Sequence, residues 1–167
     1  PHPDDFVPEM KGGGGFGWEP GEWTDDTLMA VPILRELAAG ARLEDVATLD
    51  RIAAAWKGWA RGAKDVGVQI RSVLSAAAEP SVAHLRSEAR RLHDRMGRSA
   101  GNGSLMRTAP VALAYLDDEG GLVAAARSVS DLTHYEEDTG DACVLWSLAI
   151  RHAILTGEFD VRRGLEQ

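Results

Sequence analysis

Hydrophobic residues recur at helical spacing along most of this chain, and this pattern limits the possible folds more than any other feature. Leu49, Ile52 and Trp56, for example, follow one another at intervals of three or four residues, as on one face of an α-helix. No segment of useful length alternates between apolar and polar residues, which is the pattern typical of a β-strand. The sequence therefore predicts an all-α fold.

Glycine, proline and polar clusters divide the chain into segments with this spacing. The expected helices are residues 24–41, 43–61, 66–78, 81–96, 105–116, 122–132 and 141–156. Within them we expect six side chains to be buried: Ile52, Trp56, Ile70, Leu74, Leu85 and Leu145. Residues 1–23 are rich in Pro and Gly and are predicted to form an irregular loop. The length of 167 residues suits a single domain, 1–167.

Charge and composition disfavour several classes of partner. The formal net charge of −8 and the pI of about 5.1 make nucleic acid and anionic membranes unfavourable partners. No run approaches the ~20 apolar residues that cross a bilayer, and residues 1–5 do not resemble a secretion signal. The single cysteine, Cys143, lies among apolar residues, so we expect it to be buried and reduced. A cytoplasmic location is the expectation.

A hydroxyl and two carboxylates stand together where the first helix should begin. Thr24, Asp25 and Asp26 are the oxygen ligands that Mg²⁺ or Mn²⁺ prefers, and an irregular junction lets neighbouring carboxylates diverge. The same residues could instead cap the helix, because Thr and Asp accept hydrogen bonds from free backbone N–H groups at a helix start. The residue pattern alone leaves both interpretations open.

Three further places could carry chemistry. The segment Gly101–Ser104 precedes a helix, and its glycines would let a ligand approach the backbone closely. His134, beside the carboxylates of residues 136–138, could be a general base, a metal ligand or a hydroxyl binder. Asp65 is a candidate carboxylate at the start of the third helix. Connecting turns, a satisfied loop histidine and a helix cap are the structural alternatives.

Four motifs occur in an order that resembles the ADP-ribosylglycohydrolase family, typified by the dinitrogenase reductase-activating glycohydrolase. They are Gly21–Thr27, Trp56 with Asp65–Gly67, Gly101–Pro110 and Leu132–His134. The resemblance implies an all-α fold with a binuclear Mg²⁺ or Mn²⁺ centre in a cleft that takes ADP-ribose. It also implies hydrolysis of the glycosidic bond of an ADP-ribosylated protein or small molecule.

The resemblance assigns roles to residues at matching positions. Thr24, Asp25 and Asp26 would supply the first half of the metal site, and Asp65 would be an acid/base or substrate-orienting carboxylate. Asp25, Asp26 and Asp65 are thus the candidate catalytic residues. The candidate substrate-binding residues are Gly101, Asn102, Gly103, Ser104, Met106 and His134.

Two departures from the family pattern affect the expected activity. Family members carry a second metal motif of the type Asp-x-Asp-Thr near the C-terminus, and none follows Thr156. The Gly-Asp-Ala signature of an N-terminal helix is absent too. We therefore expect this chain to hold half of the metal ligands and to be inactive by itself.

Two other functions fit the same residues. The chain could belong to an enzyme for another ribosyl or nucleotide-like substrate, since a fold does not fix a substrate. It could also be a catalytically inactive relative that binds ADP-ribose or a protein. The linkage cleaved, the choice between Mg²⁺ and Mn²⁺, and the oligomeric state have no signal in the sequence.

Overall fold

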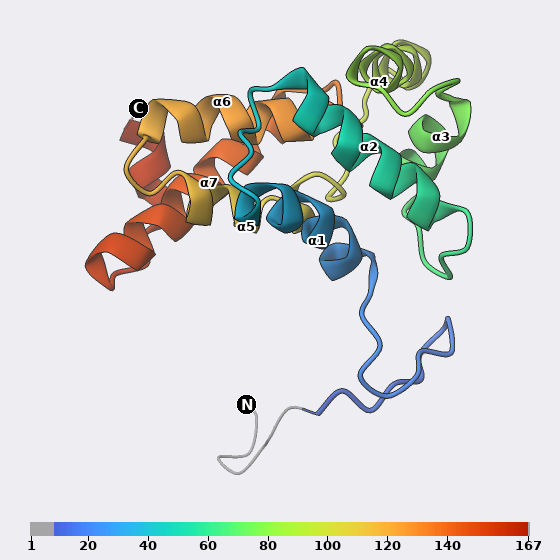
Figure 1. Cartoon of the computed structure of the whole chain (residues 1–167), viewed down its shortest axis with the longest axis horizontal. Coiled ribbons are helices and arrows are strands. Elements are labelled where there is room, and N and C mark those ends of the chain that lie inside the picture. Colours follow the sequence, from blue (N-terminus) through green and yellow to red (C-terminus); the bar gives the residue numbers. More distant parts are fainter. Residues whose placement is uncertain (1–8, 167) are drawn as a thin grey trace.

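The computed structural model describes residues 9–166, and these are helical, as predicted (Figure 1). The elements are α1 (Asp25–Ala38), α2 (Val46–Ala60), α3 (Val68–Ala76), α4 (Val82–Met96), η1 (Leu105–Arg107), α5 (Ala109–Ala114), α6 (Glu119–Ser130), α7 (Glu137–Thr156) and η2 (Val161–Glu166). Between residues 9 and 166, extended pairing is limited to one isolated bridge between Gly13 and Trp18. None of the described helices is long and apolar enough to cross a bilayer.

Side chains and glycines define several helix ends. The Asp45 carboxylate accepts a hydrogen bond from the Ala47 backbone N–H at 3.1 Å at the start of α2. Ser81 caps α4 in the same way through the His84 N–H. Gly97 ends α4 with a φ of 72°, and Gly157 ends α7 with a φ of 78°. Both values lie in the left-handed region, which glycine adopts without steric cost.

Most helix ends differ from the prediction by up to three residues, and two differences are larger. The segment 105–116 divides at Thr108 into η1 and α5, because Pro110 has no N–H for a continuous helix. The last α-helix begins at Glu137 rather than at residue 141. Its first turn contains Glu137 and Asp138, whose charges favour the positive end of the helix dipole.

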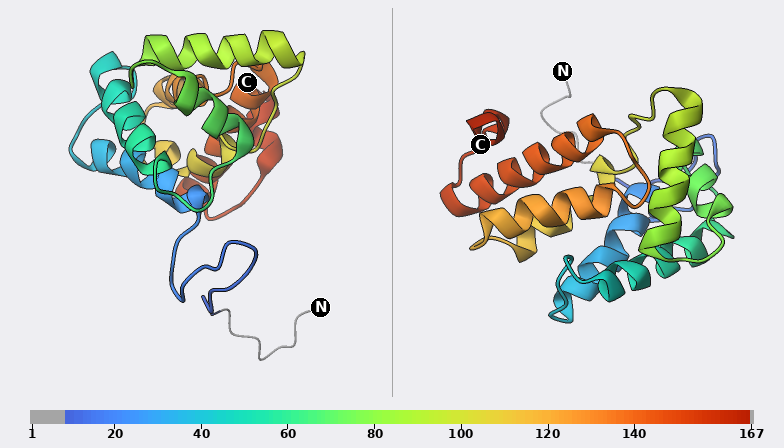
Figure 2. Two further views of the ribbon diagram at one scale, coloured as in Figure 1. Left: turned by 90° about the vertical axis from the view of Figure 1, so that its right-hand side faces the viewer. Right: turned by 90° about the horizontal axis from the view of Figure 1, so that it is seen from above.

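The helices form two groups that are joined by α1. Helices α2, α3 and α4 pack against one another, and η1, α5, α6 and α7 form the second group. Helix α1 contacts α2 on one side and α5 and η1 on the other, in the middle of the molecule (Figure 1). Figure 2 shows α6 beside α7, the most extensive contact of the second group. The site described below lies where these groups meet.

The core confirms most of the predicted burial. Trp56 and Leu85 are fully buried, as is the sulfur-bearing Cys143. Ile52, Ile70 and Leu74 are buried too. Leu145 was predicted to be buried but is only half-buried, because the inward face of α7 runs through Cys143, Val144, Ser147 and Leu148 instead.

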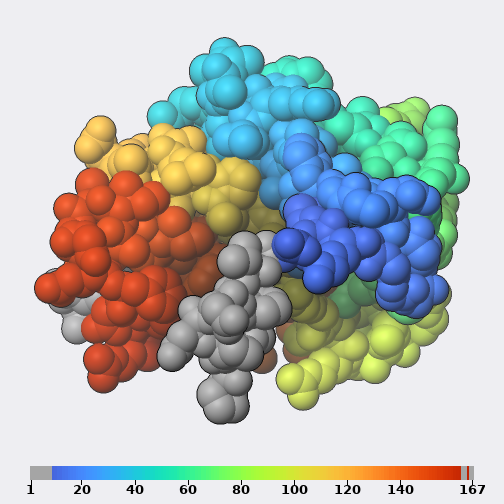
Figure 3. Space-filling model, turned by 90° about the horizontal axis from the view of Figure 1, so that it is seen from below, coloured from blue at the N-terminus to red at the C-terminus, as the bar shows by residue number. Residues whose placement is uncertain are grey.

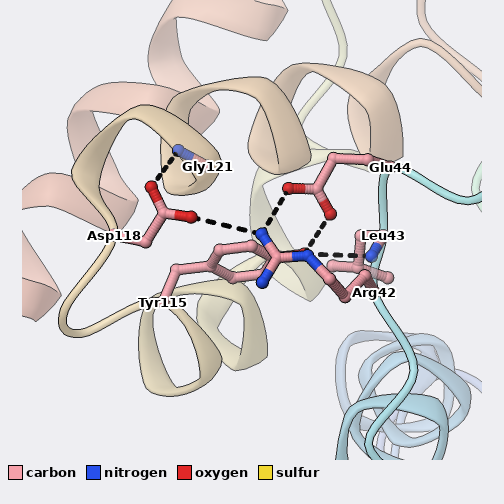
Figure 4. Close-up of polar contacts among 6 residues, drawn as sticks. All are labelled: Arg42, Leu43, Glu44, Tyr115, Asp118 and Gly121. Atoms are coloured by element: carbon pink, nitrogen blue, oxygen red, sulfur yellow. Dashed lines mark hydrogen bonds and ion pairs between the residues drawn. The ribbon is translucent and has the colours of Figure 1, made fainter.

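A network of hydrogen bonds connects the α1–α2 connection with the α5–α6 connection (Figure 4). The Leu43 backbone N–H donates to the Tyr115 hydroxyl at 2.9 Å, and this hydroxyl donates to Glu44 at 2.7 Å. Arg42 donates to Glu44 at 2.9 Å and to Asp118 at 3.2 Å. Burial raises the pKa of Tyr115 to about 12, so its phenol keeps its proton at neutral pH. This network fixes α1 against the second group.

The described part of the N-terminal segment is a loop, as predicted, and residues 1–8 of that prediction lie outside the described residues. In Figure 1 this segment extends away from the helices before α1 begins. Lys64, which precedes Asp65, donates to Glu22 at 2.8 Å and to the Gly17 carbonyl at 3.2 Å. The loop is thereby held next to the α2–α3 connection.

Candidate active site

A pocket of about 370 Å³ lies at the junction of the two helix groups. Four segments contribute to it: the start of α1, the α2–α3 connection with the first turn of α3, the loop before η1 with η1 itself, and the α6–α7 connection. Its lining residues are Asp25, Asp26, Asp65, Gly67, Val68, Gln69, Ile70, Gly101, Asn102, Gly103, Met106 and His134. Figure 3 shows the molecule from below, with the blue N-terminal residues from residue 9 on one side and the orange-red α7 on the other.

Carboxylates form one wall of the pocket. Asp25 is 9% exposed, Asp65 is half-buried and Asp26 is exposed. Burial raises the pKa of Asp25 to about 6, and the negative charges of Asp65 and Asp26 add to the increase. This wall therefore concentrates negative charge in a partly dehydrated place, where a cation would relieve the repulsion.

Helix capping does not account for these residues. Thr24 occupies the N-cap of α1, but its side chain makes no capping hydrogen bond. Its hydroxyl instead donates to the Asp26 carboxylate at 3.2 Å. Asp65 does not cap α3, because Gly67 holds the N-cap position. Asp25 Oδ1 accepts a bond from the Asp26 N–H at 3.1 Å, which occupies one of its two oxygens. All three aspartates nevertheless line the pocket.

Glycines keep the opposite wall close to neighbouring side chains. A Cβ atom on Gly101 would lie 3.1 Å from Gln69 Oε1 and 3.4 Å from His134 Nε2. A Cβ atom on Gly103 would lie 2.6 Å from Ile70 Cδ1. Neither glycine has a positive φ, so their conformations do not require glycine. Space in the pocket wall is the reason that these positions suit glycine.

His134 is held at the base of the same wall. Its ring is 1% exposed, its Nδ1 lies 2.8 Å from the Thr133 hydroxyl, and Nε2 has no hydrogen-bond partner among the described residues. Burial lowers the pKa of His134 to about 3, with a further decrease from the Arg107 charge. The imidazole is therefore neutral at physiological pH.

The structure brings eight of the ten predicted site residues to one pocket. Thr24 lies next to it, as the residue before Asp25. Ser104 lines a smaller neighbouring cavity of about 220 Å³, which shares Gly101 and Asn102 with the main pocket. The Ser104 hydroxyl is buried and has no partner among the described residues. The roles assigned to these ten residues stay predictions.

Sequence reasoning missed two polar side chains at this site. Gln69 lines the pocket and donates from its amide to the Thr133 carbonyl at 3.3 Å. Arg107 is fully buried behind His134, and its guanidinium lies 4.0 Å from the centre of the Trp56 ring. Gln69 gives no signal in the sequence, since a polar residue early in a helix is ordinary. Arg107 stands inside a predicted motif, and its apolar neighbours Leu105 and Val111 were a hint of burial.

Comparison with known proteins decides the family. The family model described as ADP-ribosylglycohydrolase matches residues 2–167. The chain belongs to the ADP-ribosylglycohydrolase family. The family resemblance predicted from the four motifs is thus confirmed, and with it the all-α fold.

Two relatives of the family place the chain within longer proteins. It is 24% identical over 152 residues to the ADP-ribosylarginine hydrolase Tri1 of Serratia proteamaculans (strain 568), covering 89% of this chain and 40% of that protein. A solved structure of an ADP-ribosylglycohydrolase-related protein complex is 28% identical, with a TM-score of 0.63, over 93% of this chain and 50% of that one. The chain thus spans about half the length of these relatives or less.

The donor atoms suit the metal that the family resemblance implies. Thr24, Asp25 and Asp26 offer hydroxyl and carboxylate oxygens, which hard divalent cations prefer. The raised pKa of Asp25 results first from burial and then from the negative charges of Asp65 and Asp26. Within residues 9–166, however, no three carboxylate, imidazole or thiol groups stand close enough to hold one ion. The metal site therefore stays a prediction.

Proposed function

We propose that the protein containing this chain hydrolyses the glycosidic bond of ADP-ribosylated substrates and releases ADP-ribose. The observation that supports the proposal is the pocket itself, whose lining includes the carboxylates of the α1 start, Asp65, the glycine loop and His134. Family membership supports the same reaction class.

The carboxylates and the glycine loop would have different roles in the reaction. Glycoside hydrolysis passes through an oxocarbenium-like state and needs a carboxylate to activate water. Asp65 is half-buried in the acidic wall and is our candidate for this carboxylate. The close-packed loop of Gly101 and Gly103 would receive the ADP-ribosyl group, since backbone N–H groups can approach phosphate oxygens there.

The same proposal includes Mg²⁺ or Mn²⁺ as cofactor, held in part by Thr24, Asp25 and Asp26. When bound, such an ion orients ribose hydroxyls and lowers the pKa of a water molecule. The negative charge around Asp25 supports this assignment.

A panel of substrates tests the reaction. The natural protein is incubated with Mg²⁺ or Mn²⁺ and with ADP-ribose linked to arginine, serine, a nucleobase or an acetyl ester, and free ADP-ribose is measured. Arginine is the first linkage to test, because a relative is named an ADP-ribosylarginine hydrolase. We expect release from at least one substrate.

A second function, binding without catalysis, is favoured by the incomplete set of metal-ligating groups in the described residues. Calorimetry with ADP-ribose separates the two. Binding without release from any substrate would support the inactive relative, and the absence of both would refute both functions.

A matched pair of glycine substitutions tests the pocket. Gly101→Ala adds a methyl group 3.1 Å from Gln69 Oε1 and 3.4 Å from His134 Nε2, which narrows the wall without a forbidden backbone conformation. Gly58→Ala adds the same group on the exposed side of α2, where nothing lies within 4 Å. We expect Gly101→Ala to weaken ADP-ribose binding at least tenfold and Gly58→Ala to leave it unchanged; equal affinities would contradict this site.

A further inference from the structure

Hydrogen bonds behind the pocket determine which nitrogen of His134 carries the proton. The Arg107 Nη2 donates to the Thr133 hydroxyl at 2.8 Å and to the Val129 carbonyl at 2.9 Å. A guanidinium can only donate, so the Thr133 oxygen is the acceptor in the first bond. The Thr133 hydroxyl has one proton of its own, and its other partner is His134 Nδ1 at 2.8 Å.

One of the two possible arrangements leaves fewer buried polar groups of Thr133 and His134 without a partner. If the Thr133 hydroxyl donates to His134 Nδ1, that nitrogen is the acceptor and the ring proton must be on Nε2. That arrangement leaves only the Nε2–H unpaired. If Nδ1 carried the proton instead, both the buried Thr133 hydroxyl proton and the Nε2 lone pair would lack a partner among the described residues, and the additional unpaired group would cost about 1–3 kcal/mol. The ring is neutral, since burial and the Arg107 charge hold the pKa of His134 far below its ordinary value.

Arg107 is itself firmly positioned. Its guanidinium lies over the Trp56 ring, and the Trp56 indole N–H donates to the Met29 carbonyl of α1 at 2.9 Å. Burial lowers the pKa of Arg107 to about 9, which leaves the group charged at neutral pH. A fixed, charged donor thus stands at one end of the hydrogen-bonded series Arg107–Thr133–His134, which we call the relay.

We propose that Arg107, acting through Thr133, holds His134 as a neutral imidazole whose Nε2–H is a hydrogen-bond donor for an oxygen atom of the ADP-ribosyl group. Arg107 and Thr133 are positioning residues in this arrangement. Of the three roles that the sequence left open for His134, it excludes general base and metal ligand, because a protonated Nε2 has no free lone pair. The identity of the ligand rests on the proposed function, whereas the position of the proton does not.

The site for this bond lies beside Gly101. Nε2 has no partner among the described residues, and the Cβ position of Gly101 is 3.4 Å away from it. An unpaired buried N–H is unfavourable, so a ligand oxygen that reaches it gains a bond without displacing another protein group. Because the ring is 1% exposed, the bond requires a small outward shift of residues 101–103.

Nitrogen NMR of the natural protein labelled at histidine tests the inference directly. The chain has five histidines, and the loss of one pair of signals in His134→Gln assigns this ring. We expect a proton on Nε2 and none on Nδ1 near pH 7. A proton on Nδ1 of His134 in the unmodified protein would overturn the proposal.

Two substitutions of Thr133 test the relay. Thr133→Ser keeps the hydroxyl, and we expect it to keep the tautomer. Thr133→Val removes the hydroxyl at nearly the same shape, and we expect a mixture of tautomers and an affinity for ADP-ribose about tenfold lower. A folded Thr133→Val protein with the unmodified His134 spectrum would refute the role of Thr133.

Addition of ADP-ribose separates this inference from the proposed function. We expect the Nε2 proton resonance to move when ADP-ribose binds. The expected tautomer in a protein that releases no ADP-ribose from any substrate would leave the relay standing and refute the enzyme. Hydrolysis by a protein whose His134 has its proton on Nδ1 would support the proposed enzyme and refute the relay.

Discussion

Aspartates at helix starts have different surroundings in this protein. Asp45 closes the first turn of α2 through the Ala47 N–H and lies outside the pocket. Asp25 accepts a bond from the Asp26 N–H at 3.1 Å, yet both carboxylates also line the pocket. Asp45 thus only caps its helix, whereas Asp25 and Asp26 also line the pocket.

This contrast gives the first prediction. In the natural protein we expect Asp25→Ala and Asp26→Ala each to abolish release of ADP-ribose while the melting temperature of the metal-free protein stays near that of the unmodified one. Asp45→Ala is the matched control: loss of a true cap costs about 0.5–2 kcal/mol of stability and should leave hydrolysis intact. Normal turnover in either of the first two variants would count against the role of that residue.

The neutral His134 makes stability depend on pH. Its pKa is about 3 in the folded chain, against an ordinary value of 6.5, so below pH 6.5 the unfolded state takes up a proton that the folded state does not. Stability from this group is complete above pH 6.5 and is lost as the pH falls toward 3. Between pH 7 and 5 the loss is about 2 kcal/mol.

His134→Gln removes this titration and leaves the other groups unchanged. We expect urea unfolding to show a smaller loss of stability between pH 7 and 5 in His134→Gln than in the unmodified protein. Parallel losses in the two proteins would mean that His134 does not remain neutral in the folded state.

At the scale of elements, Tyr115 connects parts of the chain that are far apart in sequence. Tyr115→Phe would leave the buried Leu43 N–H without its acceptor and Glu44 with Arg42 as its remaining side-chain donor. We expect a loss of about 1–3 kcal/mol in unfolding free energy, with ADP-ribose binding retained. Tyr135→Phe, on the exposed second tyrosine, is the control and should lie within about 0.5 kcal/mol of the unmodified protein. Equal stabilities of the two variants would contradict the structural role of the network.

The elements show how far the sequence could predict this structure. The spacing of Ile52 and Trp56 identified a buried helix face because that signal is local. The break at Thr108 was missed because the apolar pattern continues across it, although Pro110 removes the hydrogen bond that a single helix needs. Leu145 was misplaced because α7 has apolar residues on several sides, and packing against α5 and α6 decides which side is inward.

In the candidate site, too, local patterns could be predicted from the sequence, whereas the effects of packing could not. Asp25, Asp26 and the glycine loop are conspicuous in the sequence because polar residues or glycines cluster there. The positions of Gln69 and Arg107 depend on the packing of α3 and η1 around His134, which no local pattern encodes. A sequence can thus indicate the walls of this pocket more readily than the groups that support them.

At the scale of the molecule, the described residues contain no group of three metal-ligating side chains, and this bears on how tightly the chain would bind a metal ion. We expect calorimetry on residues 1–167 alone to show weak binding of Mg²⁺ or Mn²⁺, because a few oxygen donors do not offset the dehydration of the ion. The Asp25→Ala variant should weaken the binding further. Two tight sites on this chain would refute the expectation.

The pocket lies between two helix groups that meet mainly through α1. A ligand bound in the pocket would therefore hold the two groups together. A molecule that touches α3, the glycine loop and His134 together must slow the separation of the groups as well as occupy the space between them. Amide hydrogen exchange would register this as slower exchange in α2 and in α6, neither of which lines the pocket, and unchanged rates there would mean that the groups move as one body. We therefore expect recognition of a small ligand to stabilise the contact between the two helix groups.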